Sequence, residues 1–169
     1  MTETEKELRR LLAERILVLD GAMGTMIQSH KLDEAAFRGR RFAKHSHDLR
    51  GCNDVLCLTQ SDLISEIHLQ YLEAGADIVE TNTFNSTSIS MTDYKLEADV
   101  YDINLAGARA AKKAVAAMIA KDPSRPRFVA GAIGPTNRTC SISTDVHSAA
   151  TRGVTYEELV QAYYDQARD

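Results

Sequence analysis

The sequence lacks the features that mark several large classes of protein. Its three cysteines, Cys52, Cys57 and Cys140, form an odd set with no spacing typical of a disulfide framework. No apolar segment approaches the ~20 residues of a membrane span. The charged N-terminal decapeptide also lacks the apolar core of a signal peptide. We therefore expect a cytoplasmic protein with reduced thiols and no membrane partner.

Clusters of positive charge and phosphate-binding loops are also scarce. The 20 lysine and arginine residues are scattered, apart from those in Arg38–Arg41, and the formal net charge is −4. Nucleic acid is therefore not an expected partner. Neither G-x-G-x-x-G nor G-x-x-x-x-G-K-[ST] occurs, so nucleotide binding has little support. The 169 residues, 44% hydrophobic and 26% charged, suffice for one globular domain with a core.

One apolar run ends abruptly in an acidic residue and a glycine. In the segment RILVLDGAMGTMI, the bulky residues Ile16–Leu19 are followed by Asp20 and Gly21. Such a run is typical of a strand buried on both faces, and the glycine-containing turn lets a ligand approach the backbone. Ligands of α/β proteins bind beyond the carboxyl ends of parallel strands, so Asp20 is a candidate binding carboxylate. The alternative is that Asp20 only caps the short helix that follows.

Helical patterns alternate with further strand patterns along the chain. Gly75 is placed as the C-terminal cap of the second helix, and Gly134-Pro135 ends the last strand. Helix, glycine and strand in close succession are typical of a parallel sheet. The predicted helices are 4–14, 61–74, 96–119 and 155–169, of which the first and last begin with the capping boxes Thr4-x-x-Glu7 and Thr155-x-x-Glu158. The predicted strands are 16–20, 77–84 and 128–133, which we expect to be adjacent, parallel and in that order.

Polar residues follow the predicted strands. Glu80 and Asn82 share one face by the two-residue period, which would point both into a barrel lumen, and Asn85 follows closely. A carboxylate in an apolar strand is informative because an unpaired buried charge is costly. The alternative is a satisfied polar cluster with no ligand, and the sequence does not assign the three residues individual roles.

A second hypothesis is a self-contained α/β metal-binding module. Its ligands would be His45, His47, Cys52 and Cys57, because imidazole and thiolate are zinc ligands. The spacing H-x-H-x4-C-x4-C matches no common zinc pattern, and Cys57 lies in an apolar run. His68 falls inside a predicted helix, where we expect a surface or packing role.

Three long segments resemble one enzyme family. RILVLDGAMGTMIQ, EAGADIVETNTFNST and VAGAIGPTNRTCSIS strongly resemble the homocysteine-binding domain of cobalamin-dependent methionine synthases, within the homocysteine S-methyltransferase family, and the likeness covers about residues 11–169. The resemblance implies a parallel (β/α)₈ TIM-type barrel that holds homocysteine at the carboxyl ends of its strands. It also implies a zinc ion that keeps the sulfur as a thiolate, because metal binding lowers a thiol pKa. The methyl group would come from methylcobalamin, which methyltetrahydrofolate remethylates in other domains.

Individual residues match the family's strand-end motifs. The resemblance implies that Asp20 and Gly21 hold the amino acid, that Thr83 and Phe84 lie near the pocket, and that Gly134 belongs to the third strand end. The family's zinc cysteines stand in Gly-x-Asn-Cys and Gly-Gly-Cys-Cys-Gly motifs, and neither motif occurs here. The three cysteines of this chain are therefore not assigned to zinc.

The length of the chain is short for the implied barrel. A (β/α)₈ barrel needs at least ~200 residues, and only three β/α units are counted in residues 1–169. We therefore expect the truncated front part of the homocysteine-binding barrel, without the folate, cobalamin and activation domains. Such a fragment is expected to have no methyl transfer activity, no catalytic residue and no tightly bound zinc or cobalamin of its own.

Overall fold

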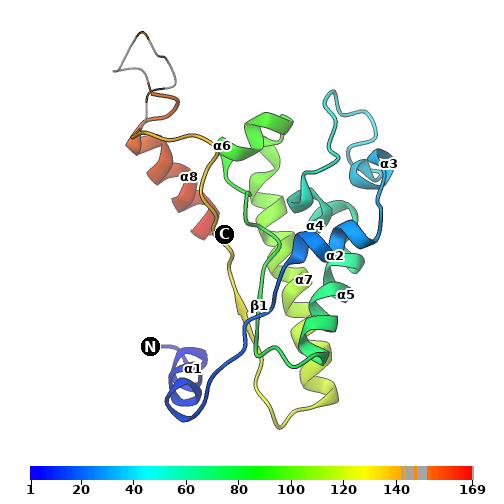
Figure 1. The fold of residues 1–169 in the computed structure, drawn as a ribbon, viewed down its shortest axis with the longest axis vertical. Coiled ribbons are helices and arrows are strands. Elements are labelled where there is room, and N and C mark those ends of the chain that lie inside the picture. Colours follow the sequence, from blue (N-terminus) through cyan, green and yellow to red (C-terminus); the bar gives the residue numbers. More distant parts are fainter. Residues whose placement is uncertain (142, 144–146, 148–151, 169) are drawn as a thin grey trace.

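The computed structural model describes residues 1–141, 143, 147 and 152–168 as a mixed α/β fold with mostly helices and a small parallel sheet (Figure 1). In chain order the helices and strands are α1 (Glu3–Glu14), α2 (Met23–Ser29), α3 (Glu34–Arg38), η1 (Asn53–Val55), α4 (Leu56–Thr59), α5 (Ser61–Glu73), β1 (Ile78–Glu80), α6 (Ser88–Met91), η2 (Thr92–Tyr94), η3 (Glu97–Asp99), α7 (Val100–Lys121), β2 (Phe128–Ala130) and α8 (Tyr156–Arg168).

The sheet has the predicted order and direction. β1 and β2 pair in parallel, with Val79 opposite Val129. The first segment joins β1 through one parallel bridge between Leu19 and Ile78, and Asp20 N donates to Ile78 O at 2.9 Å. The strands are shorter than predicted, since each named strand has three residues and the first segment makes a single bridge.

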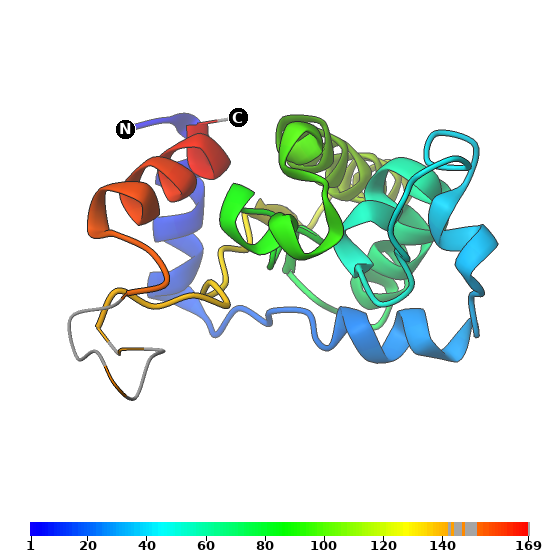
Figure 2. The same cartoon turned by 90° about the horizontal axis from the view of Figure 1, so that it is seen from above.

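The prediction that the first strand is buried on both faces is wrong. The exposed fractions of Ile16 and Val18 are 87% and 52%. Figure 2 shows this blue segment running across the molecule between α1 and α2. In the described part of the chain no other segment covers these two side chains, so this face of the first strand meets solvent.

The four predicted helices are present, with two differences at their starts, whereas the short helices α3, α4 and α6 were not predicted. α5 covers the predicted apolar stripe, and Gly75 behind it has a φ of +115°, which suits glycine. α7 begins at Val100 because the preceding residues form the short helix η3. α1 begins earlier than its predicted capping box, because Thr2, not Thr4, accepts the N–H of Glu5.

The predicted capping box of α8 is confirmed. The Thr155 hydroxyl accepts from the N–H of Glu158, and the Glu158 carboxylate accepts from the N–H of Thr155 at 2.7 Å. This exchange satisfies backbone donors at both ends of the box, which is why the local sequence alone is enough to start the helix.

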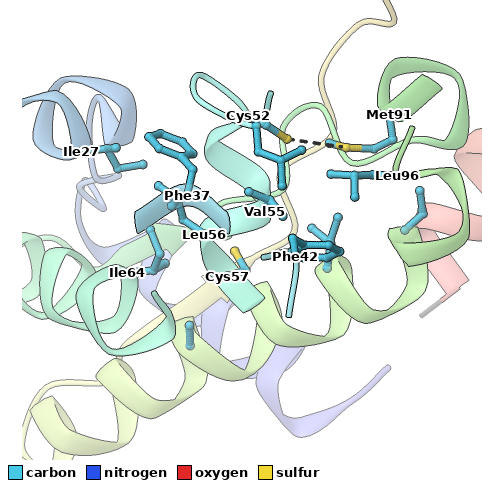
Figure 3. Packing of buried hydrophobic residues seen from close by; sticks show 14 of the residues in the cluster. Ile27, Phe37, Phe42, Cys52, Val55, Leu56, Cys57, Ile64, Met91 and Leu96 are labelled. Atoms are coloured by element: carbon cyan, nitrogen blue, oxygen red, sulfur yellow. Dashed lines mark hydrogen bonds between the residues drawn. The ribbon is translucent and has the colours of Figure 1, made fainter. Parts of the chain in front are cut away.

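The main hydrophobic core lies beside the sheet. α5 and α7 run side by side and cover one face of β1 and β2 (Figure 1). Their apolar residues, such as Ile64 on α5, meet Phe37, Val55 and Leu56 of the preceding short helices (Figure 3). No helix among the described residues is long and apolar enough to cross a membrane.

A buried carboxylate ties the start of the sheet together. The Asp77 side chain is fully buried and accepts from Arg15 Nη1 and Nη2 at 2.9 and 2.8 Å, from Arg125 Nε at 2.9 Å and from Val18 N at 2.9 Å. Arg15 and Val18 lie in the first segment and Arg125 lies in the loop before β2. This one side chain therefore fixes both segments against the start of β1.

Candidate functional site

A cleft of about 450 Å³ opens at the carboxyl ends of the first segment and β1. Polar side chains and the backbone of the Asp20–Gly24 turn form most of its wall. The lining residues are Asp20, Gly21, Ala22, Met23, Gly24, Asn53, Asp54, Glu80, Thr81, Asn82, Phe84, Asn85 and Ala132. The cleft therefore lies where ligands bind in parallel α/β sheets.

The Asp20 side chain is hydrogen-bonded to the sheet and does not cap a helix. Both of its carboxylate oxygens accept from the N–H of Glu80 at 3.1 Å, whereas the residue that caps α2 is Ala22, with no side-chain hydrogen bond. The interpretation of Asp20 as the cap of the next helix is therefore wrong. The side chain is only 3% exposed, and burial raises its pKa to about 6, against the lowering effect of the Glu80 N–H.

The charge of Asp20 has no strong counterion. Within the described part of the chain, its one ion-pair neighbour is His68, whose Nδ1 lies 4.0 Å from Asp20 Oδ2. Burial lowers the pKa of His68 to about 4, so this imidazole is neutral near pH 7. The cleft thus presents a carboxylate that a cationic group of a ligand can neutralise.

Glu80 and Asn82 both line the cleft, but their environments differ. Asn82 is buried, and its amide donates to Asn53 O at 2.7 Å, whereas Glu80 is exposed. The expected buried charge at Glu80 is therefore not found, because the strand is open to solvent on that side.

A second carboxylate on the cleft wall, Asp54, was not identified from the sequence. It is 3% exposed and accepts from the N–H of Asn85 at 2.8 Å and from the hydroxyl of Ser86 at 3.1 Å. Burial raises its pKa. The one feature of the sequence that could have identified Asp54 is its position directly before the apolar run 55–58. That position alone does not show that the carboxylate faces a cleft.

Thr83 and Gly134 support the cleft from behind, while Asp20, Gly21 and Phe84 line it. Thr83 is buried, and its hydroxyl donates to Ala132 O at 3.0 Å. Gly134 N donates to Phe84 O at 2.9 Å, and a Cβ at Gly134 would lie 2.5 Å from that oxygen. The residues that the resemblance names are thus close neighbours, in two layers.

The thiols do not fit a zinc site. Burial raises the pKa of Cys52 and of Cys57 to about 12, whereas zinc binds the thiolate. Cys57 Sγ donates to Asn82 O at 3.2 Å, and Cys52 Sγ lies 3.9 Å from Met91 Sδ in the core (Figure 3).

The two histidines of the metal-module hypothesis are engaged elsewhere. His45 Nε2 lies 2.7 Å from Tyr94 O, and His47 Nδ1 is hydrogen-bonded to the hydroxyl of Ser46. Among the described residues, no group of three or more His, Cys, Asp or Glu side chains is placed to hold a metal. The geometry therefore does not support a metal-binding module built from His45, His47, Cys52 and Cys57.

Comparisons with known proteins point to one family of enzymes. A family model described as homocysteine S-methyltransferase matches residues 17–169. The metallated form of the homocysteine methyltransferase MmuM from Escherichia coli has a TM-score of 0.68 at 23% identity, covering 95% of this chain and 52% of that chain. Its oxidized form has a TM-score of 0.63 at 26% identity, covering 94% and 53%. This chain thus spans about half the length of these neighbours.

Proposed function

Because this chain belongs to the homocysteine S-methyltransferase family, we propose that its cleft binds the amino-acid end of homocysteine. We further propose that residues 1–169 form the first part of a parallel (β/α)₈ barrel of the methionine synthase type. The observation that carries the proposal is Asp20, a nearly buried carboxylate on the cleft wall with no lysine or arginine partner in the described part of the chain.

The chemistry of the cleft suits the ammonium group and the methylene chain of an α-amino acid. A charge-assisted hydrogen bond from the ligand's ammonium group would satisfy Asp20, which already accepts from the backbone on its other side. Gly21 also lines the cleft, directly after Asp20. The exposed ring of Phe84, 53% accessible, offers an apolar wall for the methylene groups.

The sulfur end requires metal ligands that the described part of this chain does not offer. Zinc, where the family binds it, keeps the homocysteine sulfur as a thiolate, but Cys52 and Cys57 are protonated core residues here. We therefore propose that residues 1–169 hold and orient the substrate and do not transfer the methyl group. Zinc and the methyl donor, methylcobalamin with methyltetrahydrofolate in the methionine synthase type, would act through other parts of a complete enzyme.

The test is homocysteine binding to the Asp20→Asn variant of the chain. The amide would keep an oxygen for the Glu80 N–H but lose the charge, so we expect affinity to fall by about ten- to a hundredfold, the effect of ~1.5–3 kcal/mol. Titration calorimetry measures the affinity, and thermal unfolding measured in parallel shows whether stability has changed.

Two controls separate recognition from general damage. Asp93→Asn removes an exposed carboxylate outside the cleft and is expected to bind homocysteine as the unchanged chain does. A ligand without the ammonium group, 4-mercaptobutyrate, is expected to bind weakly and equally to the unchanged chain and to Asp20→Asn. Equal homocysteine affinity for these two proteins would remove Asp20 from the site.

A further inference from the structure

One buried polar side chain behind the cleft has no partner. His68 on α5 is 0% exposed, and within the described residues neither ring nitrogen makes a hydrogen bond. The sequence predicted a surface or packing role for His68. The packing role is confirmed, but the ring packs directly behind the cleft. A neutral imidazole has one donor and one acceptor, and burying either without a partner is unfavourable.

The group next to this ring is the carboxylate that lines the cleft. His68 Nδ1 lies 4.0 Å from Asp20 Oδ2, about 1 Å longer than a normal N–H···O hydrogen bond. One turn further along α5, the Tyr71 ring lies 3.3 Å from where a Cβ of Gly21 would be. α5 therefore lies directly behind the Asp20–Gly21 step, and a small side-chain movement would close the gap to Asp20.

We propose that His68 is a positioning residue for Asp20. Its neutral ring carries the proton on Nδ1, and this N–H donates a hydrogen bond to the Asp20 carboxylate when that carboxylate is charged. A neutral donor stabilises the negative charge of Asp20 and leaves that charge in place. A lysine or arginine at this position would instead neutralise it. The bond would also fix the rotation of the carboxylate, leaving its remaining lone pairs toward the cleft. An effect of this hydrogen bond on homocysteine binding rests on the proposed function, whereas the hydrogen bond itself does not depend on it.

Other titratable groups lie near Asp20. Glu80 on β1 and Asp54 on η1 line the same cleft, and Tyr71 stands beside His68 on α5. The negative charge of Glu80 opposes ionisation of Asp20. The experiment must therefore change His68 while leaving these groups in place.

The test uses nuclear magnetic resonance on the whole chain without ligand. Long-range ¹H–¹⁵N spectra report which ring nitrogen of His68 carries the proton, and the ¹³C signal of the Asp20 carboxyl group reports its titration. We expect the proton on Nδ1 at pH 8. In His68→Leu, which has no donor, we expect the proton-binding constant of Asp20 to rise about tenfold, or about one pH unit.

Two further variants separate the hydrogen bond from packing. His68→Asn keeps a donor near the position of Nδ1 and is expected to restore the Asp20 titration toward that of the unchanged chain. Ile64→Val, at a fully buried position one turn earlier on α5, loosens the core and is expected to leave the Asp20 titration unchanged.

The outcomes discriminate between the proposals. A proton on Nε2, or an Asp20 midpoint that is the same in His68→Leu as in the unchanged chain, would overturn the positioning role. If His68→Leu does not fold, the Nδ1 proton in the unchanged chain still decides. If the Asp20 titration behaves as expected but homocysteine does not bind, only the proposed function fails.

Discussion

At the scale of single residues, Asp20 combines burial with an unsatisfied charge. Its carboxylate is nearly inaccessible to solvent, and the Glu80 N–H and the nearby neutral His68 are its polar neighbours. Desolvation without a counterion is the cause of its raised pKa. A group in this state gains the most from a cationic ligand, because the ligand supplies the charge that the fold does not.

This environment predicts that homocysteine binding depends on pH. The ionised carboxylate is the form that attracts an ammonium group, and its pKa is about 6. Affinity is therefore expected to be nearly constant between about pH 7 and 8, where the ligand keeps its ammonium group, and to fall about tenfold for each pH unit below 6. Calorimetric titrations at several pH values measure this. Asp20→Asn, which cannot ionise, is the control and is expected to show a flat profile; a wild-type profile equally flat between pH 5 and 7 would contradict the prediction.

Asp77 is the opposite case, a buried carboxylate with two guanidinium partners. The paired Arg15, the Val18 N–H and Arg125 hold its pKa well below the usual range. Because the pKa is lower in the folded state than in the unfolded state, the stabilisation is present above about pH 4 and is lost as the pH falls further.

We therefore expect Asp77→Asn to destabilise the chain at pH 7. The guanidinium groups of Arg15 and Arg125 are about a third exposed, so solvent screens the pair and the expected loss is about 2 kcal/mol. The difference from the unchanged chain should shrink as the pH falls toward 2, as urea unfolding at each pH would show. Asp62→Asn, which removes an exposed carboxylate paired with Lys113, is expected to leave stability unchanged. An Asp77→Asn effect that persists at low pH would assign the loss to packing.

At the scale of elements, the ends of the strands are held together by close backbone contact. The exit from β2 passes so near the exit from β1 that Gly134 leaves no room for a Cβ beside Phe84. α8 reinforces this contact, since Tyr163 donates to Gly134 O at 2.8 Å and Gln166 donates to Thr83 O at 2.8 Å. The cleft wall therefore depends on a helix that follows it in the chain.

This contact predicts different outcomes for two alanine substitutions after the start of β2. In Gly134→Ala the new Cβ would meet the backbone oxygen of Phe84 at 2.5 Å, and we expect a loss of about 1–3 kcal/mol in the free energy of unfolding. At Gly131 nothing lies within 4 Å of the added Cβ, so Gly131→Ala is expected to be nearly neutral. Denaturant unfolding compares the two, and equal effects would show that the close approach at Gly134 does not matter.

At the scale of the whole molecule, the chain has a core on one side of its sheet and an uncovered segment on the other. α5, α7 and the short helices bury the apolar residues that meet β1, whereas Ile16, Val18 and Ile133 remain largely exposed. In a (β/α)₈ barrel further strands would lie beside these residues, which agrees with our proposal that this chain is the first part of such a barrel.

The arrangement of the thiols also leads to a prediction for the whole chain. Cys52 and Cys57 face the core and not a common site with His45 and His47, so we expect far less than one zinc per chain after dialysis against a chelator. Metal analysis of the dialysed protein gives the answer. One tightly held zinc that is lost on changing Cys52 or His47 to Ala would instead restore the metal-module hypothesis.

The sequence by itself determined the elements whose signals are local. The apolar stripe of α5, the glycine behind it and the Thr155–Glu158 box specify those helix positions through contacts within a few residues. The order and direction of the sheet followed from the alternation of helices and strands, because a short connection after each helix leaves parallel pairing as the simple solution.

Only the tertiary structure decided what surrounds each side chain. Asp20 looked equally like a helix cap until the Glu80 N–H was found on its carboxylate, 60 residues away in sequence. Ile16 looked like a core residue, but burial requires a partner surface, and the described chain places none over it. His68 and Asp54 acquire meaning from neighbours on other elements. Hydrophobic period and capping act locally, whereas desolvation and charge pairing depend on which distant segments meet.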